Sequence, residues 1–185
     1  SGAYDWSRDG KWISFGGQDI WIASASGDSK PFAFLATSFL EGGGRFSPDG
    51  KWIAYMSDET GRVEVYVRRF SGAPATEGRL QVSKSGGEDP VWRSDGQELF
   101  YVSGNQNDVG VYAARTSDLN RTGGVAVPEL LFRACPQTAV AGPMDGAPWD
   151  YVYDTDDGKR FLINCRAHPQ DRFGVLLNWT MPASR

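Results

Sequence analysis

Four aspartates at equivalent places of a repeat stand directly before a glycine, and recurring carboxylates of this kind could act as general acids or bases or bind a cation. The pairs are Asp9-Gly10, Asp49-Gly50, Asp95-Gly96 and Asp157-Gly158. An active site does not need the same acid four times. A tight turn, in contrast, uses aspartate because its carboxylate accepts hydrogen bonds from nearby backbone N–H groups. We therefore interpret all four pairs as structural turns.

Other arrangements that could do chemistry are incomplete. The segment 154–158 is similar to a calcium loop, but its glycine comes one position too early. His168 is the only histidine, and the chain offers few other ligands for zinc. The sequence has no GxSxG, GxGxxG, HRD or DFG motif. We predict no catalytic residue, no metal and no cofactor.

The aspartate–glycine pairs belong to a longer repeat. Its copies read WSRDGKWISF (6–15), FSPDGKWIAY (46–55), WRSDGQELFY (92–101) and YDTDDGKRFLI (153–163). Short apolar runs follow the turns at similar distances, at 20–22, 65–67, 111–113 and 175–177. No segment has sustained helical periodicity. About four short strands in each unit of roughly 40–46 residues predict an all-β fold, a β-propeller with about four blades.

One aromatic residue precedes each turn at the same place in the repeat. These residues are Trp6, Phe46, Trp92 and Tyr153, and we predict that they form the inter-blade core because both faces of a blade are covered by its neighbours. A second position holds Trp12, Trp52, Glu98 and Arg160. A position that accepts both tryptophan and arginine indicates a rim.

The quoted repeats resemble those of TolB-type β-propellers, although the GH…WD signature of true WD repeats is absent. The closing DDGKRFLIN…GVLLNW resembles the last blade of propellers at the C-terminus of some bacterial membrane serine/threonine kinases and related sensors. The similarity covers about residues 4–180. It implies sheets around a central channel, commonly six blades, a role in binding proteins, and a periplasmic or other extracytoplasmic location. It supplies no catalytic residue.

We expect one propeller-type domain over residues 1–185. Its blades are predicted at about 3–36, 43–82, 88–132 and 149–180, with an insert at 133–148. The last blade lacks an outer strand in this prediction, and an open edge favours pairing with another chain. Four blades that close on themselves, a homo-oligomer joined through the open edge, and a fragment of a larger propeller all remain open.

Function is expected on the face opposite the aspartate–glycine turns, where polar loops of variable length gather. The predicted contact residues are Glu41, Asp58, Glu59, Glu88, Asp89, Asn107 and His168. The expected partner is a protein or peptide bound without catalysis. Alternatives are the substrate-gating propeller of a prolyl oligopeptidase-type serine peptidase and a small-ligand or metal site in the channel.

Composition excludes other classes of function. The formal net charge is −4, and no basic run is present, which argues against a nucleic-acid partner. No apolar run is long enough to span a membrane. Cys135 and Cys165 could form one disulfide or remain as two free thiols.

Overall fold

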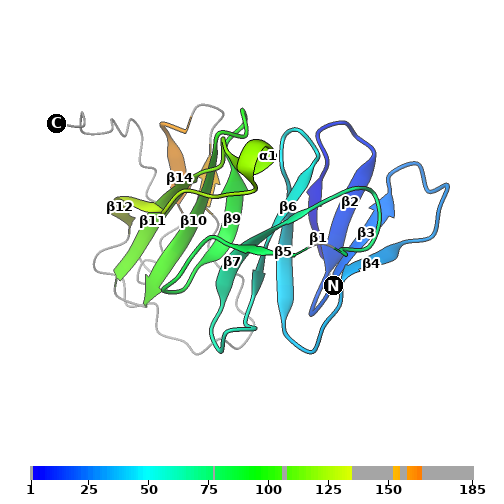
Figure 1. The fold of residues 1–185 in the computed structure, drawn as a ribbon, viewed down its shortest axis with the longest axis horizontal. Helices are drawn as coiled ribbons and strands as arrows, with labels where there is room; N and C mark the ends of the chain where they lie inside the picture. The colour runs from blue at the N-terminus through cyan, green and yellow to red at the C-terminus, as the bar shows by residue number, and fades with distance from the viewer. Residues whose placement is uncertain (1, 77, 106–107, 135–151, 155–157, 164–185) are drawn as a thin grey trace, which may run out of the picture.

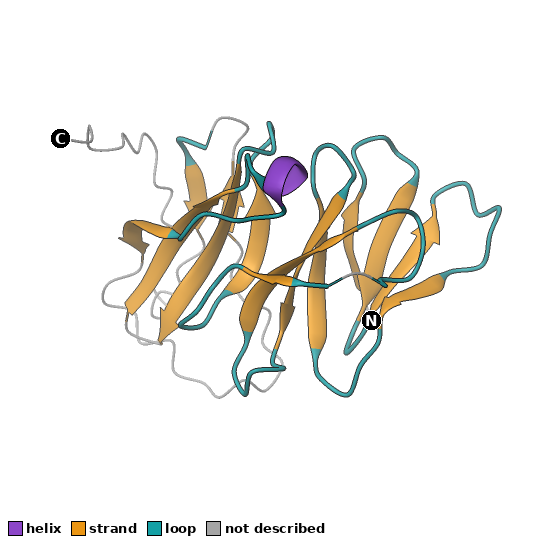
Figure 2. Cartoon of the chain, viewed as in Figure 1, coloured by secondary structure: helices purple, strands orange, loops and turns teal. Residues whose placement is uncertain are grey.

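The computed structural model describes residues 2–76, 78–105, 108–134, 152–154 and 158–163 of the 185-residue chain. Within them nearly all regular structure is β, with one short helix (Figure 2). Twelve strands form three four-stranded antiparallel sheets, and two further strands pair separately. The prediction of an all-β fold is confirmed, and the three sheets fit part of a β-propeller.

Each four-stranded sheet is a simple meander of consecutive strands, which we call a blade. Blade 1 contains β1 (Gly2–Trp6), β2 (Trp12–Gly16), β3 (Ile20–Ser24) and β4 (Phe32–Leu35). Blade 2 contains β5 (Glu41–Phe46), β6 (Trp52–Ser57), β7 (Glu64–Arg69) and β8 (Leu80–Gln81). Blade 3 contains β9 (Glu88–Trp92), β10 (Glu98–Asn105), β11 (Asp108–Arg115) and β12 (Glu129–Ala134), with helix α1 (Leu119–Thr122) before β12.

The blades lie side by side, so that their first strands are neighbours (Figure 1). Strand β1 contacts β5, and β5 contacts β9. Beyond blade 3, β13 (Val152–Asp154) contacts β9 and pairs with β14 (Phe161–Ile163). The first strand of each blade is therefore the inner strand, as expected for a propeller whose inner strands surround an axis.

Both faces of blade 2 are apolar because each packs against another blade. In β6, Ile53 and Tyr55 join a core cluster with blade 1, while Trp52 and Ala54 join a cluster with blade 3. Side chains in a strand alternate between its two faces, so an unbroken apolar run is what a sheet covered on both sides requires. A third cluster, which includes Phe100 and Phe161, joins blade 3 to β14.

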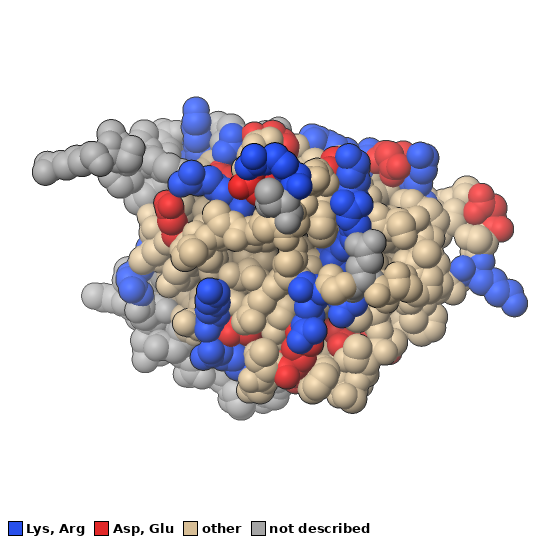
Figure 3. Space-filling view, viewed as in Figure 1, with Lys and Arg blue, Asp and Glu red and all other residues tan. Residues whose placement is uncertain are grey.

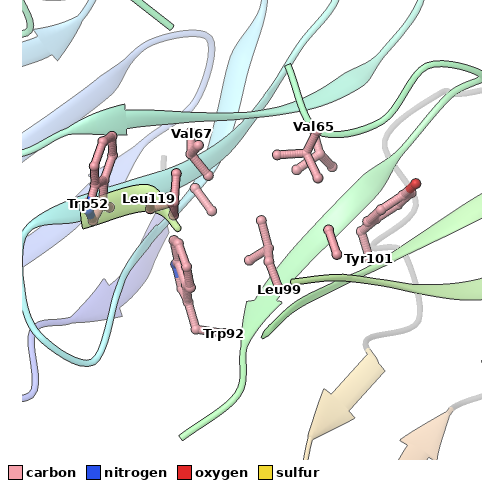
Figure 4. Packing of buried hydrophobic residues seen from close by; sticks show 10 residues of the cluster. Trp52, Val65, Val67, Trp92, Leu99, Tyr101 and Leu119 are labelled. Atoms are coloured by element: carbon pink, nitrogen blue, oxygen red, sulfur yellow. The ribbon is translucent and has the colours of Figure 1, made fainter. Parts of the chain in front are cut away.

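Aromatic rings account for much of this packing. Phe70 makes edge-on contacts with Trp12, Phe34 and Phe46 at centroid distances of 5.7, 5.8 and 5.2 Å. Between blades 2 and 3, Trp92 packs with valines of β7 and with Leu99 (Figure 4). Buried rings of this size each contribute several kcal/mol, about 3–5 by truncation, so the blades hold one another in place.

The predicted rim position of Trp52 is wrong, because Trp52 is buried with 6% of its surface exposed. Helix α1 covers it: Leu119 packs in the same cluster, and the Trp52 Nε1–H donates to Asn120 Oδ1 at 2.9 Å. The sequence pattern gave no sign of this four-residue helix, which is too short to show a helical period.

The first two aspartate–glycine turns share one set of hydrogen bonds. Asp9 Oδ1 accepts from the Ser7 hydroxyl at 2.7 Å and from the Lys11 N–H at 3.1 Å, and Asp49 Oδ1 accepts at 2.6 and 3.1 Å from the equivalent groups. The glycine after each aspartate has a φ near +70°, a left-handed conformation that glycine adopts without strain.

The later turns differ in part. Asp95 Oδ1 accepts from the Gln97 N–H at 2.9 Å, while Arg93 replaces the serine of the earlier turns. Asp157 lies outside the described residues, but Gly158 has the same left-handed φ of 67° as Gly96 with 70°. These bonds hold the carboxylates against the turn backbone, which agrees with a structural interpretation.

The prediction that Trp6 belongs to the inter-blade core is wrong for this chain. Trp6 is 60% exposed, whereas the equivalent Phe46 and Trp92 are 6% and 9% exposed. Phe46 packs toward blade 1 and Trp92 toward blade 2, so each ring faces the blade before its own. Among the described residues no sheet precedes blade 1, and the Trp6 ring therefore stays open to solvent. Tyr153 lies in β13, whose side chains are outside the described part.

The predicted fourth blade, 149–180, and the insert, 133–148, fall mostly outside the described residues, as do Cys135 and Cys165. The described part of the fourth unit is the β13–β14 hairpin. How the chain closes, and whether it forms a homo-oligomer through an open edge, remain predictions. In the described part, the short α1 is far from the length and apolar character that a membrane crossing requires.

Candidate functional site

A pocket of about 300 Å³ lies where the inner strands of the three blades meet. Its walls come from β1, β5, β9 and the first two aspartate–glycine turns. The side chains that give it chemical character are Asp5, Trp6, Arg8, Arg45, Asp89 and Trp92. Two acidic and two basic side chains lie beside two indole rings, so the pocket can bind a ligand through charge and apolar contact together.

Each inner strand is irregular at the place where it borders this pocket. Pairing with the second strand shifts between Ala3 and Asp5 in β1 and between Gly42 and Arg45 in β5. In β9 the register shifts between the pair Val91–Phe100 and the pair Glu88–Val102. Bulges of this kind redirect side chains and are common beside binding sites.

The bulges of β5 and β9 use different residues for the same backbone conformation. Gly43 stands three residues before Phe46, and Asp89 stands three residues before the equivalent Trp92. Their φ angles are 65° and 49°. Glycine adopts this left-handed conformation freely, whereas aspartate does so at a cost. Asp89 is the only non-glycine residue with a positive φ in the described part of the chain.

One oxygen of the Asp89 carboxyl group lacks a hydrogen-bond partner in the described part of the chain. This oxygen is Oδ2, which is buried. Burial raises the pKa of Asp89 to about 6, although the nearby Arg45 charge acts in the opposite direction. Burial, and then the charge of Asp89, raises the pKa of the adjacent Glu88 to about 7. The β9 bulge therefore carries two acids that are costly to ionise.

The other charged groups of the pocket are fixed by bonds between blades. Arg45 donates from Nη1 to the Tyr4 carbonyl oxygen, and the Phe46 N–H donates to Asp5 Oδ2 at 2.8 Å. Burial raises the pKa of Asp5 above its ordinary value. Arg8 Nη1 donates at 2.6 Å to the Ser94 carbonyl oxygen, which ties the first turn to the third.

Charged side chains also gather on the outer rim of the turns, along the edge that carries α1 (Figure 3). The pairs there include Lys11 with Asp9 at 3.3 Å and Arg121 with Asp118 at 2.6 Å. These groups are largely exposed, and exposed pairs of this kind contribute about 0–1 kcal/mol each. We regard this rim as solvated surface and the inner pocket as the candidate site.

The structure separates the predicted contact residues. Asp89 lines the pocket, and Glu88 is its neighbour in β9. Asp58 and Glu59 are half-buried: Asp58 Oδ1 accepts from the Leu40 N–H at 2.9 Å, and Glu59 pairs with Arg79. Two further candidates, Asn107 and His168, lie outside the described residues.

Glu41 is not a surface contact residue, and this prediction is wrong. It begins strand β5 instead of lying in a loop, and only 1% of it is exposed. Its carboxylate accepts hydrogen bonds from both the hydroxyl and the backbone N–H of Thr37. A buried carboxylate bonded in this way fixes the connection from blade 1 to blade 2.

Sequence reasoning missed three polar residues of the pocket, which are Asp5, Arg8 and Arg45. It placed the site among the loops opposite the aspartate–glycine turns, whereas Arg8 belongs to one of those turns. One signal was present in the repeat, because aligning Phe46 with Trp92 sets Asp89 against Gly43. No group of three or more metal-ligating side chains occurs in the described ranges.

Several solved structures share this fold. They include a putative TolB from Agrobacterium tumefaciens, with 21% identity, a TM-score of 0.59, and coverage of 74% of this chain and 50% of that one. TolB from Acinetobacter baumannii follows with 19% identity, a TM-score of 0.52, and coverage of 85% and 38%. A puromycin-hydrolyzing peptidase from Mycobacterium tuberculosis has 18% identity, a TM-score of 0.62, and coverage of 86% and 27%.

These similarities show that the chain has the fold of a TolB-type β-propeller, as its repeats indicated. The chain spans half or less of the length of each of these proteins. No protein-family model matches the sequence, and no curated protein matches it significantly. The resemblance to the propellers of membrane kinases remains a prediction.

Proposed function

We propose that this chain is a non-catalytic binding module that captures a segment of a protein or peptide in the pocket between its inner strands. The observation that carries the proposal is Asp89, which lines the pocket on a left-handed bulge and whose buried Oδ2 has no hydrogen-bond partner among the described residues. Sparsely populated backbone conformations cluster at active sites, ligand clamps and switch regions.

The scaffold suits this role. The walls of the pocket come from strands that are packed on other blades, so their side chains are held in place before a ligand arrives. Preorganised groups lose little conformational entropy on binding. A volume of about 300 Å³ is at the lower end for ligand pockets and fits a few residues of an extended peptide.

The proposal predicts that peptides selected by the intact chain from a random display library bind in this pocket. Arg8→Glu reverses a charge on the pocket wall and should change the affinity of the selected peptides by about tenfold or more, with weaker binding of acidic peptides and tighter binding of basic ones. Lys30→Glu makes the same charge change in the exposed loop between β3 and β4 and should leave affinity unchanged. Fluorescence polarisation with labelled peptides measures both effects.

A thermal melt of each variant checks that it remains folded, because Arg8→Glu also removes the bond to Ser94. The proposal is contradicted if no peptide is enriched, or if both folded variants bind the selected peptides as tightly as the wild-type chain does. Loss of binding in both variants would likewise place the site outside the pocket.

A second candidate is the substrate-gating propeller of a serine peptidase. The observation that favours it is the similarity to the propeller part of a peptidase, with a TM-score of 0.62. The gene from which the chain derives tests this candidate. A downstream α/β-hydrolase segment with a GxSxG motif would support it, and a gene without such a segment would remove it.

A further inference from the structure

We propose that the pocket binds the cationic group of a lysine or arginine side chain carried by an extended peptide, and that the Asp89 carboxylate is the acceptor. This inference rests on the proposed function, because it names the chemical class of ligand for the same pocket. It adds a requirement for positive charge that a general peptide-binding surface does not have.

The same bulge forms in blade 2 without an acid. Gly43 forms the equivalent bulge in blade 2 with a φ of 65° and no side chain. Blade 3 places an aspartate in the same conformation at 49°, which glycine would adopt with less strain. The carboxylate therefore needs a reason outside the packing of its own blade, and a ligand provides one.

Nothing in the described part of the protein neutralises this carboxylate. Arg45 is the nearest influence on its charge, but Arg45 donates to the Tyr4 carbonyl, and no ion pair or hydrogen bond joins it to Asp89. The Asp89 N–H is directed at Met56 Sδ at 3.2 Å. A buried acid without a donor gains most from a ligand that brings both a proton donor and a positive charge.

The balance of charge and the walls both favour a basic side chain. In the pocket wall Asp5 and Asp89 equal Arg8 and Arg45 in number, and Glu88, which precedes Asp89 in β9 but is not part of the wall, adds one further acid beside it. The indole rings of Trp6 and Trp92 border the same space. Methylene stems of lysine and arginine pack on such rings, and their charged ends are attracted to the ring faces.

The test uses the intact chain and three capped tripeptides. Acetyl-Gly-Arg-Gly-amide supplies the cation, its citrulline twin has nearly the same shape without the charge, and its glutamate analogue has the opposite charge. Nitrogen-15 NMR follows the indole N–H signals of Trp6 and Trp92, assigned with Trp6→Phe and Trp92→Phe. We expect both signals to move with the arginyl peptide, and the citrulline twin to bind about tenfold more weakly or worse.

Two variants identify the acceptor. Asp89→Asn keeps the shape and tolerates the left-handed backbone, and Asp89→Gly copies the bulge of blade 2. Both should stay folded and lose about tenfold or more of the affinity for the arginyl peptide, and Asp89→Gly should also melt at a higher temperature than the wild-type chain. A merely structural aspartate would instead give a less stable glycine variant with unchanged binding.

The outcomes separate this inference from the proposed function. Equal binding of the arginyl and citrulline peptides, tighter binding of the glutamate analogue, or full binding by folded Asp89→Asn would overturn the inference. If the library peptides need Arg8 for binding but carry no basic residue, the proposed binding function holds and the inference of a cationic ligand fails. Absence of any pocket-dependent peptide would remove both.

Discussion

Replacing Trp92 by alanine is expected to lower the free energy of unfolding by about 3–5 kcal/mol, because it removes a ring from the contact between blades 2 and 3. Trp92 is 9% exposed and packs with Trp52, Val67 and Leu99. Its Nε1–H donates to the Arg45 carbonyl oxygen at 3.1 Å, so truncation also leaves a carbonyl without its donor. Urea denaturation followed by far-ultraviolet circular dichroism measures the loss.

Trp6→Ala is the matched control, since Trp6 occupies the same place in the repeat but is 60% exposed. Little buried area disappears with it, and we expect a loss below about 1 kcal/mol. Similar losses in the two variants would contradict the packing described here. The comparison distinguishes a ring that lies between two described blades from a ring that is largely exposed in the described part of the chain.

Asp89→Asn is expected to stabilise the chain at pH 7.5 and to reduce the dependence of its stability on pH. The folded pKa of Asp89, about 6, lies above its ordinary value of 3.8. The folded state therefore holds the proton more tightly than the unfolded state does. The stability from this group is fully present below pH 3.8 and is lost as pH rises through about 6.

When the pH falls from 7.5 to 5, Asp89 is expected to raise the free energy of unfolding of the wild-type chain by an amount on the order of 1 kcal/mol, allowing for partial access of water. Glu88, with a pKa raised to about 7, acts in the same direction, and its shift shrinks when Asp89 loses its charge. Urea midpoints of the wild-type chain and Asp89→Asn at both pH values measure the effect. Stability that stays flat or falls toward pH 5 would contradict it.

Asp9→Asn is the control, because the pKa of Asp9 is shifted in the opposite direction to that of Asp89. Hydrogen bonds from the Ser7 hydroxyl and the Lys11 N–H lower the pKa of Asp9, so this group titrates below the window from pH 5 to 7.5. Its replacement should leave the slope of stability against pH unchanged in that window. A change of slope equal to that of Asp89→Asn would show that the pH dependence does not come from the pocket.

The fold could be predicted because its signals are local and repeated. A turn such as Ser47 to Gly50 fixes a hairpin through its own hydrogen bonds, and alternating apolar residues beside it fix the strands. Four copies of one pattern then imply one architecture. Trp6 shows the limit of this reasoning, because equivalent positions in a repeat are equally buried only if each blade has the same neighbours.

The pocket could not be predicted in the same way, because it depends on contacts between residues far apart in the chain. Arg8 reaches Ser94, and Arg45 reaches Tyr4, across blades whose spacing the sequence does not state. Loop polarity pointed instead to Glu41, which is buried and bonded to Thr37. Asp89 was named as a loop residue, but its strained conformation in the β9 bulge appears only in the structure.

The most direct test of the central claim, that the inner strands hold an acid without a hydrogen-bond partner among the described residues, is a carbon-13 NMR titration of the Asp89 carboxyl. We predict a midpoint near pH 6 in the free chain and a lower midpoint when the chain is saturated with the arginyl peptide. A midpoint near the ordinary value of 3.8 in the free chain, or one that the peptide does not move, would contradict the account.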